Sequence, residues 1–177
     1  RLMGGIVSPD GKFFVYNSAG VGEGSVNFLY RYDLVKREQV QIFEEKTDNF
    51  FYQPTVWLDN EWFLSMYTSQ GSDAPAYRKT HTLINAKTAA TKEITFEGNF
   101  DSKPSPTYDH KAFTYTTFDY DATKKKSVAH IKTVDLNGVT KTVFESSKFE
   151  YGNIFWIDKD TLAAFTRSTD KIEENPF

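Results

Sequence analysis

Residues 6–16 read IVSPDGKFFVY, which is a short apolar segment followed by a polar turn and an aromatic-rich segment. Asp10-Gly11 is a hairpin-turn dipeptide, because glycine tolerates a positive φ and the aspartate side chain bonds neighbouring backbone N–H groups. The apolar and aromatic runs on either side of the turn are typical of strands. The stretch therefore predicts an antiparallel hairpin that turns at Asp10.

The same arrangement recurs along the chain. Asp59, Asp109 and Asp158 follow Asp10 at successive intervals of 49, 50 and 49 residues. Each of the four aspartates precedes a short apolar or aromatic run, at residues 13–16, 62–64, 112–115 and 162–165. A fixed period of about 50 residues indicates one supersecondary unit repeated in tandem.

A second turn marker repeats in register with the first. Asp33, Asn85 and Asp135 lie 52 and 50 residues apart, each between two runs of strand-forming residues. The alternation Val40-Gln41-Ile42 after the first of these turns fits a strand with one buried face. Two hairpins in each repeat predict four short antiparallel strands, which we call a, b, c and d in chain order.

Four-stranded units at this spacing are typical of the blades of a β-propeller. The sequence therefore predicts an all-β fold, a β-propeller segment of about 3.5 four-stranded antiparallel blades. We expect a single segment over residues 1–177, with blades at about 4–48, 49–98, 99–147 and 148–177, the last of them incomplete. A β-sandwich is the alternative, but it does not require two turn markers to recur in register.

Closed propellers have about four to eight blades, so this number of repeats does not close a ring. A longer chain, a homodimer or added partner strands would each complete one. The sequence does not begin with Met, and of the three we expect the longer chain, so that the segment is part of a larger propeller.

The stretch Ser8-Pro9-Asp10-Gly11-Lys12, followed by an aromatic strand, resembles the blade signature of TolB-like propellers, the WD40-like PD40 repeat. The same signature is found in the propeller domains of prolyl-oligopeptidase-type peptidases. Asp135-Leu136-Asn137-Gly138 is similar to the family's second turn, whereas only the first repeat carries the complete Ser-Pro-Asp-Gly-Lys. The resemblance implies a propeller fold. Together with the absence of cysteine, it implies an extracytoplasmic location, periplasmic or secreted.

Composition excludes several classes of protein. The chain is 39% hydrophobic and 25% charged, which is typical of a globular domain. A net charge of −3 gives no electrostatic basis for binding nucleic acid. No apolar run has the length of a membrane span and no basic amphipathic helix can be read, so we expect no membrane insertion. The absence of cysteine excludes disulfides, thiolate metal sites and a cysteine nucleophile.

We expect the binding face at the end of the blades where strands b and c are joined. The b–c connections, at residues 17–27, 69–77 and 118–127, are long and unlike one another, and loops on a rigid scaffold often carry binding residues. Aromatic residues recur in the expected d–a connections at the same end. The candidate binding residues are Phe50, Tyr52, Phe100, Phe149 and Tyr151 of these connections, with Tyr77 and Tyr120 of the b–c loops. They would form an aromatic collar, or alternatively pack one repeat against the next.

No catalytic or metal site is predicted. His81, His110 and His130 lack zinc-ligand spacing and form no recognisable catalytic arrangement. Asp119 and Asp121 are two carboxylates in an expected loop, but the further acidic residues and the glycine of a calcium loop are absent. The turn aspartates are interpreted as structural, and no cofactor is expected.

The sequence therefore predicts a non-catalytic binding or scaffold module that recognises a protein or peptide. The alternative is the propeller portion of a hydrolase, either a glycoside hydrolase or a peptidase-associated propeller. A glycoside hydrolase needs two carboxylates facing each other across its pocket. The turn aspartates are expected at the end of strand a that lies away from such a pocket, so they do not supply this pair.

Overall fold

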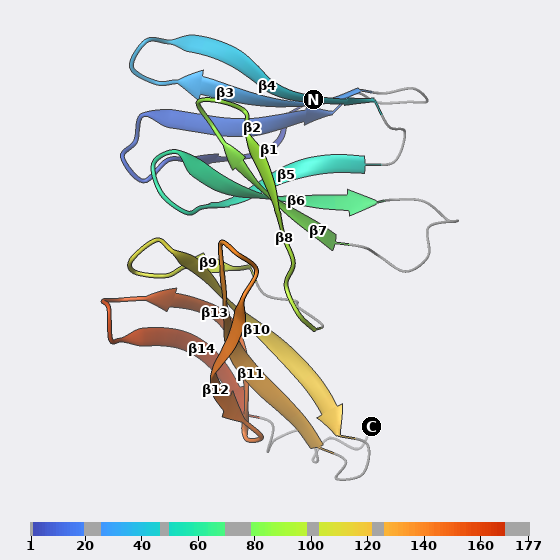
Figure 1. The fold of residues 1–177 in the computed structure, drawn as a ribbon, viewed down its shortest axis with the longest axis vertical. Coiled ribbons are helices and arrows are strands. Elements are labelled where there is room, and N and C mark those ends of the chain that lie inside the picture. The colour runs from blue at the N-terminus through green and yellow to red at the C-terminus, as the bar shows by residue number, and fades with distance from the viewer. Residues whose placement is uncertain are drawn as a thin grey trace, which may run out of the picture. The chain divides into compact units, whose positions relative to one another are not determined.

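The computed structural model describes residues 2–19, 26–46, 50–69, 79–98, 103–121 and 126–168 of the 177-residue chain. These residues form strands and turns and no helix, so none of them forms a helix that could cross a membrane (Figure 1). The strands are β1 (Leu2–Val7), β2 (Phe13–Ala19), β3 (Val26–Asp33), β4 (Glu38–Lys46), β5 (Phe50–Trp57), β6 (Trp62–Ser69), β7 (Lys79–Asn85), β8 (Thr91–Ile94), β9 (Ser105–Pro106), β10 (Ala112–Asp121), β11 (Lys126–Asp135), β12 (Thr140–Ser146), β13 (Phe149–Trp156) and β14 (Leu162–Ser168). The predicted all-β fold is confirmed.

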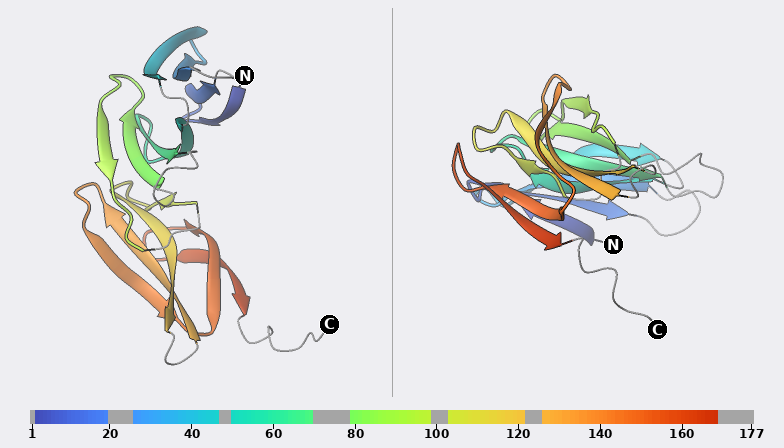
Figure 2. Two further views of the ribbon diagram at one scale, coloured as in Figure 1. Left: turned by 90° about the vertical axis from the view of Figure 1, so that its right-hand side faces the viewer. Right: turned by 90° about the horizontal axis from the view of Figure 1, so that it is seen from below.

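The strands form meandering sheets in which neighbours along the chain pair with each other. Three sheets have four antiparallel strands, in the orders β1-β2-β3-β4, β5-β6-β7-β8 and β9-β10-β11-β12 (Figures 1 and 2). In the described residues the last sheet consists of β13 and β14 alone. The four-stranded antiparallel unit predicted from the two turn markers is therefore present three times.

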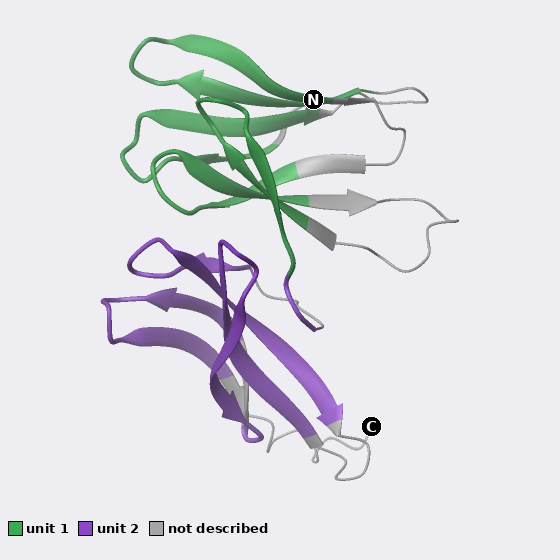
Figure 3. Cartoon of the chain, in the orientation of Figure 1, with its two compact units in different colours: residues 1–95 green, residues 96–177 purple. Residues whose placement is uncertain are grey.

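The chain divides into two compact units, residues 1–95 and residues 96–177 (Figure 3). Unit 1 holds the sheets β1–β4 and β5–β8, and unit 2 holds β9–β12 and β13–β14. Each unit therefore contains one pair of successive repeats. The two pairs can be compared position by position because the repeats share their turn markers.

The marker aspartates organise the turns as the sequence predicts. Asp10 Oδ1 accepts hydrogen bonds from the Ser8 hydroxyl at 2.7 Å and from the Lys12 N–H at 3.1 Å. Asp109 Oδ1 does the same with the Thr107 hydroxyl at 2.8 Å and the Lys111 N–H at 3.2 Å. Such bonds satisfy backbone groups that the hairpin leaves unpaired. The structural interpretation of these aspartates is confirmed.

Two further observations extend this interpretation of the turns. The second markers, Asp33, Asn85 and Asp135, each accept two backbone N–H groups from the residues that follow them. Gly11 has a φ of 71°, and His110 at the equivalent position of the third repeat has a φ of 57°. The turn conformation is therefore kept even where a side chain replaces glycine.

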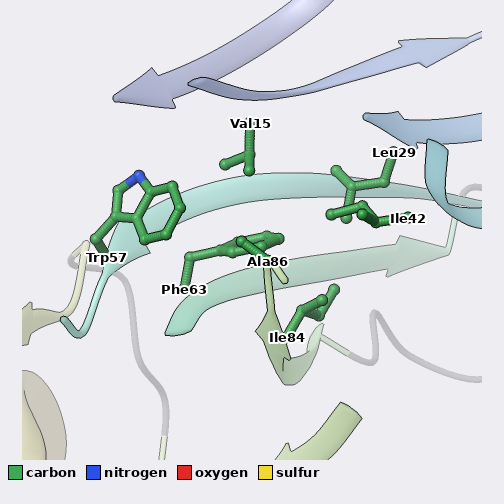
Figure 4. Close-up of a cluster of buried hydrophobic side chains, with 7 residues drawn as sticks. All are labelled: Val15, Leu29, Ile42, Trp57, Phe63, Ile84 and Ala86. Carbon is green, nitrogen blue, oxygen red and sulfur yellow. The ribbon is translucent and has the colours of Figure 1, made fainter. Parts of the chain in front are cut away.

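The core of unit 1 lies between its two sheets. Its buried members are Val15, Leu29, Ile42, Trp57, Phe63, Ile84 and Ala86, whose side chains converge in Figure 4. The rings of Trp57 and Phe63 lie 5.3 Å apart between centroids. Burial of so many large apolar groups supplies most of the free energy that holds the two sheets together.

Unit 2 has a buried cluster between β11 and β13. It consists of Ala129, Ile131 and Ile154, and Phe118, Leu162 and Ala164 pack against it partly buried. Phe113, Tyr115 and Val134 are also fully buried in this unit. The Trp156 indole Nε1–H on β13 donates a hydrogen bond to Thr114 Oγ1 on β10 at 2.7 Å. Polar contacts therefore contribute to the packing of these two sheets.

Candidate functional site

Four of the residues predicted to form an aromatic collar lie in strands rather than in connections. Phe50 and Tyr52 belong to β5, where Phe50 pairs with Ser69, and Phe149 and Tyr151 belong to β13, where Phe149 pairs with Ser168. The predicted boundary was wrong because aromatic residues also favour strands. The side chains of these four residues, and Tyr77 and Phe100 as a whole, lie outside the described residues. The collar itself stays a prediction.

The b–c connection of the third repeat was predicted too long. The pairing of β10 with β11 runs without a break from Ala112 and Asp135 to Asp121 and Lys126. Asp119, Tyr120 and Asp121 are therefore strand residues, not loop residues. β-branched and aromatic residues continue through both strands, and they stabilise the ladder beyond the point where charged residues suggested a loop.

This hairpin presents Tyr120 near its end. Tyr120 pairs with Ser127 and its surface is 67% exposed, although the hairpin on which it stands is firmly paired. An exposed tyrosine offers a large apolar ring and a hydroxyl, and it loses little conformational entropy on binding. Of the candidate residues, Tyr120 is the one whose side chain the structure describes, and its exposure suits a binding contact.

A histidine flanked by two carboxylates braces the same end of the sheet. His130 on β11 lies between Asp119 on β10 and Glu145 on β12, with Nε2 3.0 Å from Asp119 Oδ2 and Nδ1 3.5 Å from Glu145 Oε2. The His130 side chain is only 14% exposed, whereas those of Asp119 and Glu145 are 65% and 67% exposed. Sequence reasoning missed this contact, because it depends on the register of three strands.

An aromatic ladder on the first sheet was also missed. Tyr16 stacks on Phe14 and on Tyr30 with ring centroids 5.4 Å apart in each case, and Phe28 lies 5.8 Å from Tyr30. The Tyr16 hydroxyl donates to Gln39 Oε1 at 2.7 Å, and burial, followed by the neighbouring Tyr30 and Tyr32, raises the Tyr16 pKa. The alternation of aromatic residues at 14 and 16 and at 28, 30 and 32 is the signal that would have revealed it.

Comparison of the fold with solved structures gives a TM-score of 0.60 to TolB from Acinetobacter baumannii, at 20% sequence identity over 96% of this chain. The chain has the TolB-like β-propeller fold. This confirms the resemblance that the turn signature carries, and at such identity the likeness shows the fold alone. The chain spans 39% of the length of that TolB.

Two further solved structures are similar in fold to this chain. Oligogalacturonate lyase from Vibrio parahaemolyticus gives a TM-score of 0.56 at 12% identity, over 94% of this chain and 46% of that one. A protein described as a conserved lipoprotein from Clostridium novyi gives 0.51 at 14% identity, over 76% of this chain and 86% of that one. No protein-family model and no curated protein matches the sequence.

At these identities the likeness to TolB and to the lyase shows the fold and does not distinguish a binding module from an enzyme. The turn carboxylates of this TolB-like chain are poorly suited to general acid catalysis. The Ser8 hydroxyl lowers the pKa of Asp10, the Thr107 hydroxyl lowers the pKa of Asp109, and the Asp160 N–H lowers that of Asp158. A general acid needs a raised pKa instead.

The described residues hold no group of three His, Cys, Asp or Glu side chains that could bind a metal ion. The His130 contact brings together only one nitrogen ligand and two carboxylates that face different nitrogens of its ring. In this part of the chain, the contact of His130 with Asp119 and Glu145 is interpreted as a structural support for the hairpin that carries the exposed Tyr120.

Proposed function

We propose that the chain is a non-catalytic binding module that recognises a protein or peptide at the b–c end of its sheets. The observation that carries the proposal is Tyr120, which is 67% exposed near the end of a hairpin whose pairing is unbroken. A rigid scaffold that presents an exposed aromatic side chain is a common basis of recognition, because little order is lost on binding. The TolB-like fold supports the same class of function.

The side chains around Tyr120 favour a particular kind of peptide. Asp119 and Glu145 place two largely exposed carboxylates at this end of the sheet, and each carboxylate contacts one nitrogen of the His130 ring. A peptide with an apolar side chain for Tyr120 and a lysine or arginine nearby would complement both features. Charge complementarity would chiefly raise the association rate and the specificity.

Selection from a displayed peptide library on the immobilised chain tests this proposal. Selected peptides should bind the parent chain and should lose at least about tenfold in affinity with Tyr120→Ala, as expected for an aromatic hot spot. Val35→Ala is the matched control, because Val35 is 72% exposed in a c–d turn of unit 1. Peptides that bind the Tyr120→Ala variant as tightly as the parent would contradict the proposal.

The likeness to oligogalacturonate lyase supports a second candidate, the propeller portion of a hydrolase or related enzyme. A panel of glycan and peptide substrates tests it. Turnover that persists through purification and disappears in Asp119→Asn would contradict the non-catalytic proposal. Equal background rates for the parent and the variant would support that proposal.

We also propose that the chain works outside the cytoplasm, in the periplasm or as a secreted protein. Its likeness to TolB and to a protein described as a lipoprotein, together with the absence of cysteine, supports this location. Cell fractionation of the source organism with an antibody against the chain tests it. Recovery of the protein only in the cytoplasmic fraction would contradict the proposal.

A further inference from the structure

The c–d turn of the third repeat contains an asparagine followed by glycine, Asn137-Gly138. Every other asparagine of the sequence precedes a larger residue. An Asn-Gly pair readily loses the side-chain amide, because glycine has no Cβ to hinder the attack of its own nitrogen on the preceding side chain. The turn that holds the pair decides whether this reaction can occur in the folded chain.

The turn leaves both reacting groups open to water. Asn137 is exposed, and within the described residues its side-chain amide makes no hydrogen bond. Gly138 has a φ of 81°. In the part of the chain that the structure describes, only its chain neighbours have atoms within 4 Å of the point where a Cβ of Gly138 would stand. The Asn137 side chain therefore has room to approach the Gly138 backbone.

The tip of a c–d turn stays exposed even with a complete sheet beside it. In the first repeat the equivalent turn lies between β3 and β4, and the sheet β5–β8 packs against that sheet through the core of unit 1. Val35 at the tip of this turn is nevertheless 72% exposed. The exposure of Asn137 is thus a property of the turn itself.

Asp135 holds the turn of the third repeat closed. Its Oδ1 accepts the N–H of Asn137 at 2.8 Å and the N–H of Val139 at 2.9 Å. Its backbone carbonyl accepts the N–H of Gly138 at 3.0 Å. The Gly138 nitrogen has to leave this bond before it can attack, so the turn must first open locally. Exposed turns open at a small cost in free energy, and the fold therefore slows the reaction without preventing it.

Two other turns show what makes Asn137 the reactive residue. Asp10 also precedes a glycine, but the Ser8 hydroxyl lowers the Asp10 pKa. An aspartate with a lowered pKa is ionised at neutral pH, and an ionised carboxylate is a poor electrophile. Asn85 is buried and precedes Ala86, and its amide oxygen accepts two backbone N–H groups. The amide of Asn137 is neither ionised nor held in this way.

We propose that Asn137 is a site of spontaneous deamidation in the folded chain. The Gly138 nitrogen attacks Asn137 Cγ and forms a new C–N bond, the Cγ–Nδ2 bond breaks, and ammonia leaves with the proton of the Gly138 N–H. Water then opens the resulting succinimide at either of its carbonyl groups, which gives aspartate or isoaspartate at position 137. Water is the one co-reactant.

The isoaspartate product would change the turn. Its main chain runs through the side-chain carbons, which lengthens the backbone between positions 137 and 138. The bonds of Asp135 to the N–H groups of Gly138 and Val139 depend on the present spacing and should be lost. The new carboxylate also repels that of Asp135. The whole length of β11 separates this turn from the hairpin that carries Tyr120, so the site is independent of the b–c end.

The test follows the purified 177-residue chain in mildly alkaline buffer by peptide mass mapping. The peptide that contains Asn137 should gain the mass difference between asparagine and aspartate, and protein isoaspartyl methyltransferase should label it. Peptides with the other asparagines should convert more slowly. Hydrogen exchange of the Gly138 and Val139 amides should become faster as the product accumulates, because the turn then opens more often.

Substitutions in the turn separate the steps of the reaction. Asn137→Gln keeps a side-chain amide but lengthens the chain by one carbon, so a five-membered ring cannot form and conversion should be lost. Gly138→Ala should slow conversion by hindering the attack. Asp135→Ala should speed it about fivefold, the factor by which the loss of one hydrogen bond shifts a local opening equilibrium. Asp135→Asn is the matched control and should react at nearly the parent rate, since Asn85 accepts the same kind of bonds in the second repeat.

An intact Asn137 in the folded chain, under conditions that convert a free peptide of residues 133–141 completely, would overturn the proposal. Faster conversion of another asparagine would overturn it too. Equal rates in the parent and in Gly138→Ala would show that the glycine has no part in the reaction, and this result would also overturn it. If Gly138→Ala fails to fold, conversion of Asn137→Gln at the parent rate has the same meaning.

Discussion

Trp57 in unit 1 and Trp156 in unit 2 occupy equivalent positions, each two residues before a turn aspartate, Asp59 or Asp158. Their surroundings differ. Trp57 is enclosed by apolar side chains, and in the described residues its Nε1 has no hydrogen-bond partner. Trp156 is only partly buried, borders a cavity, and bonds Thr114, which stands where unit 1 has Val15. The same backbone unit is therefore held together mainly by apolar burial in one pair of repeats and partly by a polar contact in the other.

The difference teaches that repeats conserve their turns more strictly than their packing. The turn aspartates bond their own backbones in both units. Side chains at other equivalent positions vary instead: Phe13, Arg31 and Ile42 of unit 1 correspond by strand register to Ala112, Thr133 and Val143 of unit 2. We expect the difference to appear in unit-resolved stability, measured by native-state hydrogen exchange, because a chain with two units need not unfold in one step.

The largest effect is expected when each tryptophan is truncated. Trp57→Ala should lower the free energy of unfolding of unit 1 by about 3–5 kcal/mol, because it empties a buried site. Trp156→Ala should cost unit 2 clearly less, because its side chain already borders open space. Hydrogen exchange of β2 and β6 amides, compared with β10 and β13 amides, measures both. Equal losses in the two units would remove the basis of the comparison.

The next largest contrast in stability is expected where the pairing of strands c and d skips one residue. That residue is Ile42 of β4 in unit 1 and Val143 of β12 in unit 2. Ile42→Ala should destabilise unit 1 by about 2–5 kcal/mol, since Ile42 belongs to its buried core. Val143→Ala at the equivalent, half-exposed position should cost about 1 kcal/mol or less. Exchange rates of amides in β3 and β11 measure the two effects. A larger loss for Val143→Ala than for Ile42→Ala would show that Val143 contributes more to stability than its 50% exposure suggests.

Exchanging Val15 and Thr114, which are equivalent residues of the two units, should have a moderate effect on stability. Thr114→Val removes the acceptor of the Trp156 N–H and should cost unit 2 about 1–2 kcal/mol. Val15→Thr brings a hydroxyl beneath the indole of Trp57, and it should cost less than an ordinary buried hydroxyl because the Trp57 N–H can donate to it. Indole N–H chemical shifts detect whether the bond forms. An unchanged Trp57 signal would show that the indole cannot reach the new hydroxyl.

The smallest contrast is expected from pH, because both units share the turn carboxylates. The pKa values of Asp10 and Asp109 are lowered in the folded chain, chiefly by the hydroxyls of Ser8 and Thr107. A lowered folded-state pKa stabilises the fold above the unfolded pKa of about 3.9, and this stabilisation is lost as the pH falls through the folded value. Denaturant titrations between pH 7 and pH 2.5 should therefore show stability falling below about pH 4.

Asp10→Asn and Asp109→Asn should each flatten the acid limb of that profile slightly, by similar amounts in the two units. Glu38→Gln is a suitable control at an exposed position of β4. A profile as steep in the two turn variants as in the parent would show that these turns contribute nothing to acid sensitivity.

Local chemistry decided which features the sequence could predict. The hairpins at Asp10 and Asp109 were predictable, because an aspartate and its following backbone N–H groups form a turn with no help from distant residues. Strand ends were predicted less well. Phe50 and Phe149 lie inside strands, and Asp119 to Asp121 continue a strand, because cross-strand pairing extends a ladder beyond its local signals.

The sequence by itself determined the repeating four-stranded unit, its turns and, through the turn signature, the TolB-like fold. Only the tertiary structure decided which equivalent positions are filled: Ile42 is buried and Val143 half exposed, and only Trp156 borders the cavity. The reason is physical. A turn is stabilised by residues adjacent in sequence, whereas burial depends on side chains that a neighbouring repeat, about 50 residues away, brings to the same place.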